Sequence, residues 1–137
     1  MRAASSFRFS AALLATLSLA GCGSDDDRDV CAGADSTSAF VFVETPVSGE
    51  HVDSGFAVTG CSNTFEGTVS WRLRDRVGRE LTKGFTQGGS REPGAFSFSV
   101  RFDVDATQIG QLEVYEPRVT TEGFPPVLNV VPVVLGE

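Results

Sequence analysis

The most constraining feature of this 137-residue chain is the alternation of apolar and polar side chains in several short segments. The clearest segment is 67–75, GTVSWRLRD, whose apolar members are Val69, Trp71 and Leu73. Successive side chains of a β-strand point to opposite faces, so this spacing predicts a strand with one buried face. Segment 95–104, AFSFSVRFDV, alternates in the same way, with Phe96, Phe98, Val100 and Phe102 on one face.

Further strands are predicted at 40–44, 56–61, 79–87, 111–116 and 127–135. Turn-rich or breaker segments separate the predicted strands, at 46–55, 75–78, 88–94 and 117–126. Leu112 and Val114 should point inward, and Pro132 marks its strand as an edge or a bulge. About seven short strands without any helical period are typical of an immunoglobulin-like antiparallel β-sandwich. We therefore expect a single all-β domain over residues 39–136, with Trp71 in its core.

The N-terminal residues have the pattern of an export signal. Arg2 and Arg8 precede an apolar run at 9–20, which is too short to span a bilayer. The sequence Leu-Ala-Gly-Cys at 19–22 resembles the lipobox of bacterial lipoproteins. That resemblance implies removal of residues 1–21 and a diacylglycerol on Cys22. The alternative is an ordinary signal with a chance cysteine.

The chain has three cysteines. Lipidation of Cys22 leaves Cys31 and Cys61 in an oxidising compartment, which predicts one disulfide. In an antiparallel sandwich Cys61 ends its strand where the first strand begins, and Cys31 lies nine residues before Phe40. A bond is therefore geometrically reasonable. The alternative is two unbonded thiols.

Residues 22–38 are small, polar and acidic, so we expect a flexible tether between lipid and domain. The aspartates at 25–27 could hold a cation, although such runs are more often simply solvated. The net charge of −7 argues against nucleic-acid binding. The partners that we expect are a membrane, reached through the N-terminal lipid, and an envelope protein or cell-wall component.

Residues 56–116 carry a more specific pattern. A Phe-x-Val-x-Gly strand is followed by Phe-Glu-Gly-x-Val, Asp-x-x-Gly and Gly-Phe-Thr. The pattern resembles the immunoglobulin-like domain associated with bacterial spore germination, which is sometimes found beside a GerMN domain. The matching residues are Phe65, Glu66, Gly67, Val69, Asp75, Gly78, Gly84, Phe85 and Thr86.

This resemblance covers residues 40–135 approximately and implies a sandwich at the cell envelope with no catalytic residues. No GerMN domain accompanies it here. Cys61 stands where the family usually has a small or hydroxyl residue, so a disulfide would be special to this chain.

The residues give little sign of an active site. The only histidine, His51, has Glu50 and Asp53 nearby, which is ordinary loop composition. Asp103 and Asp105 could supply oxygens to calcium, but such a site needs six or more. We expect no metal, no cofactor and no catalysis.

Alternating connections should place loops 62–66, 87–94 and 117–126 at one end of the sandwich. We expect this end to face the membrane, with Phe65, Phe124 and Pro125 available for apolar contact. Loops 46–55, 75–78 and 103–110 should form the other end. The alternative is that the aromatic side chains only plug the end of the core.

The end away from the membrane is the expected partner-binding tip. Its candidate residues are Asp53, Asp75 and Asp103, with Glu50 and Asp105 beside them. The alternative is that these carboxylates are only solvated. The sequence thus predicts a lipid-anchored, extracytoplasmic binding domain, on the outer membrane if the cell has two membranes. A structural spacer and an unrecognised enzyme are the alternatives.

Overall fold

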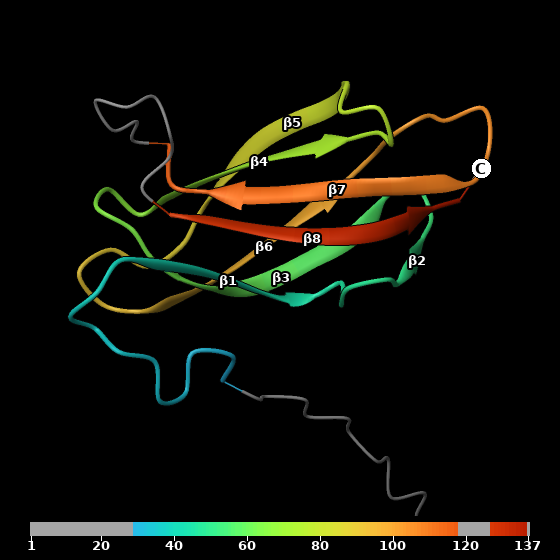
Figure 1. Cartoon of the computed structure of the whole chain (residues 1–137). Helices are drawn as coiled ribbons and strands as arrows, with labels where there is room; N and C mark the ends of the chain where they lie inside the picture. The colour runs from blue at the N-terminus through green and yellow to red at the C-terminus, as the bar shows by residue number, and fades with distance from the viewer. Residues whose placement is uncertain (1–28, 118–126, 137) are drawn as a thin grey trace, which may run out of the picture.

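The computed structural model describes residues 29–117 and 127–136, which form two sheets packed face to face (Figure 1). The three-stranded sheet has the order β1-β3-β6: β1 (Phe40–Thr45), β3 (Phe56–Asn63) and β6 (Gly94–Val100). The five-stranded sheet has the order β2-β8-β7-β4-β5: β2 (His51–Val52), β8 (Leu128–Leu135), β7 (Gln108–Tyr115), β4 (Thr68–Arg74) and β5 (Glu80–Gln87). No helix in the described ranges is long and apolar enough to cross a membrane.

The predicted alternation is confirmed in the core. Val69 and Leu73 of β4 are fully buried, and Trp71 between them stacks on Phe98 of β6 with ring centroids 4.9 Å apart. This contact joins the two sheets, so the tryptophan is a core residue as expected. The other buried apolar residues also lie on inward-facing positions: Val41, Val43, Val52, Val58, Phe96, Val100, Leu112, Val114, Val131, Val133 and Leu135.

The strands differ from the prediction in several places. β7 begins at Gln108, three residues earlier than predicted, and β3 continues two residues further, to Asn63. The predicted loop 46–55 contains the two-residue strand β2, which pairs in parallel with β8. The predicted strand 95–104 ends at Val100, because the Ser54 side chain forms hydrogen bonds with the backbone beyond it. The Ser54 hydroxyl donates to the Phe102 carbonyl at 2.7 Å and accepts the Phe102 N–H at 2.9 Å. The backbone of Phe102 is thereby satisfied outside the sheet.

Pro132 lies in the part of β8 that does not pair with β2, which reaches only Val134 and Leu135. Its carbonyl accepts the Gly49 N–H at 2.8 Å on the outer side of β8, away from β7. The N and C=O of one strand residue point the same way, so the proline nitrogen also faces away from β7. The ladder to β7 therefore loses no hydrogen bond. β8 itself lies between β2 and β7, but no strand pairs with its outer side at Pro132.

The predicted grouping of loops is confirmed for the described residues. At one end the Thr64 N–H donates to the Gly89 carbonyl at 3.0 Å, which joins the β3–β4 and β5–β6 loops. We call this end, with residues 63–67, 88–93 and 116–117, the tether end. The far end contains residues 46–55, 75–79 and 101–107 (Figure 1). The predicted contributions of Phe124 and Pro125 lie outside the described residues.

Candidate functional site

The chain before β1 is fastened to the outer face of the three-stranded sheet. Cys31 and Cys61 form a disulfide with their Cα atoms 5.4 Å apart, so the predicted bond is confirmed. Cys61 lies in register between Phe42 and Ala95, on the opposite face from the inward Val43–Gly60–Phe96 row. The exposed fraction of Cys61 is only 2%, because the segment before β1 that carries Cys31 covers it.

Asn63 makes a second attachment. Its side-chain amide donates to the carbonyls of Ser36 and Ser38, at 3.2 Å each. Residues 29–38, part of the predicted tether, are thus held against the domain. Cys22 and the aspartates at 25–27 lie outside the described residues.

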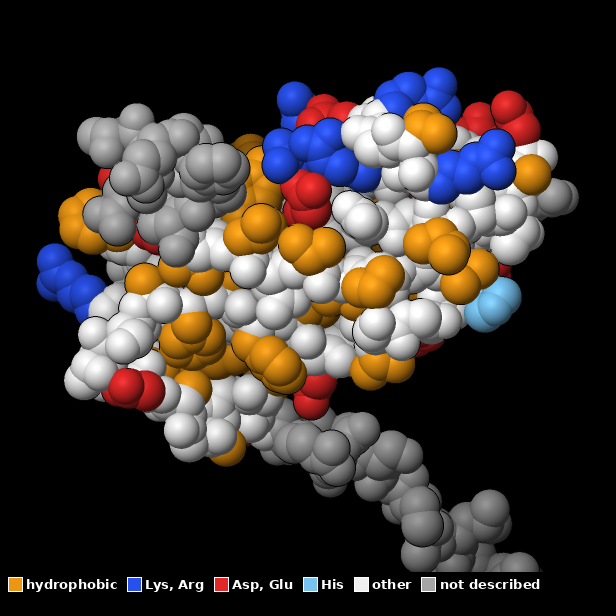
Figure 2. Space-filling view, viewed as in Figure 1, with side chains coloured by type: hydrophobic (Ala, Val, Ile, Leu, Met, Phe, Trp, Pro, Cys, Tyr) orange, Lys and Arg blue, Asp and Glu red, His pale blue; other side chains and the backbone are white. Residues whose placement is uncertain are grey.

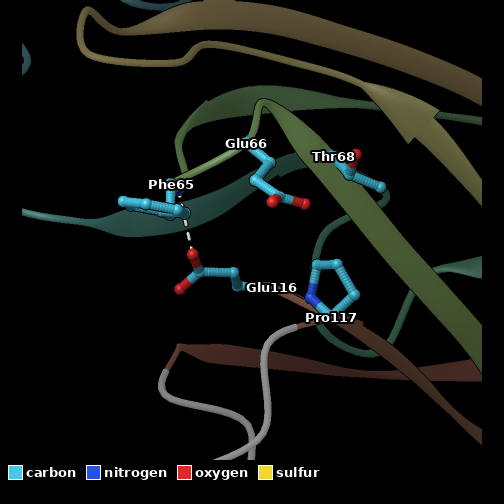
Figure 3. Close-up of a pocket in the computed structure, with 5 residues that line it drawn as sticks. All are labelled: Phe65, Glu66, Thr68, Glu116 and Pro117. Carbon is cyan, nitrogen blue, oxygen red and sulfur yellow. Dashed lines mark hydrogen bonds between the residues drawn. The ribbon is translucent and has the colours of Figure 1, made fainter.

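A small hollow opens at the tether end (Figure 3). It has a volume of about 270 Å³ and is lined by Phe65, Glu66, Thr68, Glu116 and Pro117. The Phe65 backbone N–H donates to Glu116 Oε1 at 2.9 Å, while the Phe65 ring is 69% exposed. The hollow therefore combines two carboxyl groups with an aromatic and a proline surface.

Glu116 is the unusual residue of this hollow. It follows Leu112 and Val114 in the inward-facing row of β7 and continues that row one position beyond the strand, so it is only 2% exposed. Its Oε2 atom is buried and has no hydrogen-bond partner in the described part of the chain. Buried carboxylate oxygens are normally paired, because an unpaired one has lost its water without replacement.

A second hollow, of about 410 Å³, shares Phe65 and Glu116 with the first. Arg91 of the β5–β6 loop also lines it, in a left-handed backbone conformation with φ of 70°. Such a conformation is uncommon for a residue other than glycine and costs on the order of 1 kcal/mol. Glu116 thus lies between two hollows. Sequence reasoning missed it, although its phase with Leu112 and Val114 was visible.

At the far end Asp75 is buried in a turn. Its Oδ1 accepts the N–H groups of Val77 and Arg79, at 3.0 and 2.9 Å, and its Oδ2 pairs with the Arg79 guanidinium at 3.1 Å. Burial alone would raise the pKa of Asp75. The backbone hydrogen bonds from Arg79 and Val77, together with the charge of Arg79, outweigh burial and hold the pKa below its ordinary 3.8.

Both carboxylate oxygens of Asp75 are therefore occupied within its own turn, and its predicted role in binding a partner stays a prediction. The other two candidates, Asp53 and Asp103, are exposed. Arg76 and Arg79, both exposed, line a hollow together with Asp103, so the charge of this part of the far end is mixed rather than purely acidic. The turn uses Asp75 because tight turns need an acceptor for their inward N–H groups.

The remaining candidates form no metal centre. His51 is exposed at the start of β2, and Asp103 and Asp105 are exposed in the β6–β7 loop. Within residues 29–117 and 127–136, no three His, Cys, Asp or Glu side chains are grouped closely enough to hold a metal ion.

The outer face of the five-stranded sheet carries a row of apolar side chains (Figure 2). Ile109, Leu128 and Val130 are 62%, 47% and 45% exposed. Pro132 and Val134 continue the row along β8, since they alternate with the buried Val131, Val133 and Leu135. Sequence reasoning missed this row, although VLNVVPVVL is apolar on both faces.

Polar side chains border this apolar row on β4 and β7. Glu113 is almost buried between two arginines: Oε2 pairs with Arg72 Nε, and Oε1 lies 3.1 Å from Arg74 Nε. The Arg72 guanidinium also lies over the Tyr115 ring, 5.4 Å from its centroid. The outer face of the five-stranded sheet thus has an apolar row on one part and a strip of charged side chains, paired with one another, beside it.

The Phe-Glu-Gly and Gly-Phe-Thr motifs have local structural roles. Gly67 and Gly78 adopt positive φ values of 73° and 84° in the turns around β4. Gly84 faces Trp71, and a Cβ at this position would lie 2.6 Å from Trp71 Cζ2. The pattern therefore specifies the β3–β4–β5 region rather than a reaction.

Comparison with known proteins agrees with an immunoglobulin-like fold. The profile of Gmad2, an immunoglobulin-like domain of bacterial spore germination, matches residues 40–120, from β1 to beyond β7. A search of curated proteins found no match. The matched region is more than half of the chain, so the chain belongs to the family of immunoglobulin-like domains of bacterial spore germination.

Proposed function

We propose that this protein is a lipid-anchored, extracytoplasmic binding protein without catalytic activity of its own. Its immunoglobulin-like family supports a non-enzymatic binding domain. The lipobox-like sequence ending in Cys22 supports the anchor. The partner is an envelope protein or a cell-wall component, because those are the macromolecules within reach of a domain anchored to the membrane.

The attachment of residues 29–38 limits that reach. Cys31 lies only nine positions after Cys22. A fully extended chain of that length spans about 30 Å. The domain therefore works close to the membrane surface, on the outer membrane where the cell has two.

The observation that carries the binding function is the apolar row on the outer face of the five-stranded sheet. Scattered exposed apolar side chains are normal, but a contiguous row beside charged residues is typical of a protein–protein contact. Ile109, Leu128 and Val130 are each about half exposed or more, and they lie on the adjacent strands β7 and β8. A spacer domain would have no need of such a surface.

Site-specific photo-crosslinking in cells tests this function. A photoreactive amino acid at Val130 should give one saturable crosslinked product. The same amino acid at Ser99, exposed on the outer face of the other sheet, is the matched control and should give none. Equal products from both positions, or none from Val130, would support a structural spacer instead.

Metabolic labelling tests the anchor separately. Cys22→Ser should abolish incorporation of a labelled fatty acid and leave an uncleaved or soluble form. A Cys22→Ser protein that still takes up the fatty acid would refute lipidation at this residue.

The far end is a weaker candidate surface for a partner. Asp53 and Asp103 are exposed there, although Arg76 and Arg79 line a hollow with Asp103 and offset its charge. An association through this tip should weaken as salt rises. Crosslinks that survive unchanged in a folded Asp53→Lys/Asp103→Lys variant would exclude it.

A further inference from the structure

We propose that the hollow between Phe65 and Glu116 binds a primary alkylammonium group. Such a group is carried by the lysine side chain of a protein or peptide, or by a free diamine. This site lies at the tether end, away from the apolar row on the outer sheet face, so the two proposals can fail independently.

The unpaired oxygen of Glu116 carries the inference. The side chain lines the hollow, is 2% exposed and uses only Oε1, which accepts the Phe65 N–H at 2.9 Å. Oε2 is buried without a hydrogen-bond donor, and no described residue supplies one. A charged donor would be favoured, because charge-assisted hydrogen bonds to a carboxylate are roughly twice as strong as neutral ones.

The geometry selects among cations. A guanidinium binds best when both oxygens of a carboxylate are available, but Oε1 of Glu116 is occupied. A quaternary ammonium has no N–H for Oε2. A hard metal ion needs six or more oxygens, whereas among the described residues only Glu66 and Glu116 contribute carboxylates to this hollow. A primary ammonium is compact and has three donors, so it fits one free oxygen.

The walls of the hollow suit the methylene stem of such a ligand. Pro117 and the exposed ring of Phe65 provide apolar surface, and the ring face also attracts a cation. Thr68 and Glu66 add a hydroxyl and a second carboxylate (Figure 3). The hollow therefore offers a charged receptor for the ammonium and an apolar path for the chain that carries it.

The described part of the chain does not supply this cation itself. Lys83 is the only lysine of the sequence, and it pairs with Glu80 at 3.1 Å on β5. Arg91 lines the second hollow with Glu116, yet the ion pairs between described residues do not join these two. Because no described residue offers a free ammonium group, we place its source in another molecule.

Calorimetric titration of the full-length protein in detergent micelles tests the proposal at low salt. The main probe is Nα-acetyl-lysine methylamide, and 1,5-diaminopentane represents a free diamine. Matched probes are the corresponding derivatives of arginine, Nε-acetyl-lysine and Nε-trimethyl-lysine. We expect saturable binding of at least one primary amine, with little or none of the three matched probes. The tighter of the two amines identifies the source.

Variants locate the site. Glu116→Gln should weaken binding of the amine roughly tenfold to hundredfold, the range expected for loss of a charged hydrogen bond. Glu92→Gln, an exposed carboxylate at the same end but outside the hollow, should leave the affinity unchanged.

Three results would overturn the proposal: no saturable binding of either amine, equal affinity in Glu116→Gln, or tighter binding of the trimethylated probe. If Glu116→Gln does not fold, Glu66→Gln decides. An affinity lowered about threefold or more then supports the site, because a carboxylate near the ammonium contributes at longer range. An unchanged affinity refutes it.

Discussion

Asp75 and Glu116 are two buried carboxylates at opposite ends of the same sandwich, and they are satisfied very differently. Their exposed fractions are 5% and 2%. Asp75 accepts two backbone N–H groups and an arginine, whereas Glu116 accepts one backbone N–H and leaves Oε2 unpaired. Burial alone thus does not distinguish a structural carboxylate from one available to a ligand. The count of donors does.

The difference follows from the loops that surround each side chain. The chain after Asp75 turns tightly, so residues two and four positions later direct their N–H groups at it. The donor to Glu116 comes instead from Phe65, 51 positions away on the β3–β4 loop. The tight turn supplies hydrogen-bond donors to both oxygens of Asp75. The contact between two distant loops supplies only one hydrogen bond to Glu116.

The largest expected effect comes from the covalent link near the tether end. The double variant Cys31→Ala/Cys61→Ala should lose roughly 3–4 kcal/mol of unfolding free energy, because the bond closes a loop of 30 residues in the unfolded chain. Urea unfolding of the full-length protein in detergent measures this. A loss below about 1 kcal/mol would show that Asn63 and the packing of residues 29–38 hold this segment without the bond.

The next largest effect is expected at Asp75, the carboxylate whose two oxygens both have hydrogen-bond donors. Asp75→Asn removes the charge that the turn donors and Arg79 stabilise, so the melting temperature at neutral pH should fall by roughly 5–10 °C. Exposed Asp105→Asn is the matched control, with no comparable change expected. An unchanged melting temperature in Asp75→Asn would mean that the turn does not depend on the charge.

The pH dependence of that effect has a definite sign. The folded-state pKa of Asp75 lies below its ordinary 3.8. The stability contributed by its charge is therefore present in full above 3.8 and is lost as the pH falls through the lower folded-state pKa. The difference in melting temperature between wild type and Asp75→Asn should shrink across this acid range. A difference that is constant with pH would contradict the assignment.

The smallest effect is expected at Glu116, the carboxylate with an unpaired oxygen. Without ligand, Glu116→Gln should change the unfolding free energy by less than about 1 kcal/mol, because an amide oxygen can still accept the Phe65 N–H. Chemical unfolding of the two proteins side by side measures this. A loss above about 2 kcal/mol would indicate that a cation already pairs with Glu116 in the unliganded protein.

Most of the sandwich could be predicted because its strands are buried on one face, and a period of two then appears in the sequence. The inward rows of β4 and β7 were predicted from Val69, Trp71 and Leu73, and from Leu112 and Val114. The strand β2 could not be predicted, because two residues show no period. It forms only where the end of β8 offers unpaired backbone groups.

The candidate site was less predictable for a physical reason. Asp75 and Glu116 each extend an inward row by one position, so their burial could be inferred from phase alone. Their hydrogen-bond donors could not, because the Phe65 N–H reaches Glu116 only after two distant loops meet. The burial of Asp75 at the far end and the hollow at the tether end were therefore both missed.

The most direct test compares the two carboxylates within one molecule. Amide signals of Phe65 and Val77 are followed in the ¹⁵N-labelled full-length protein as the tighter-binding of the two amines, Nα-acetyl-lysine methylamide or 1,5-diaminopentane, is added. The account predicts a saturable shift at Phe65, whose N–H donates to Glu116, and no shift at Val77, whose N–H donates to Asp75. Equal shifts at both amides, or an unmoved Phe65 signal at saturating probe, would contradict it.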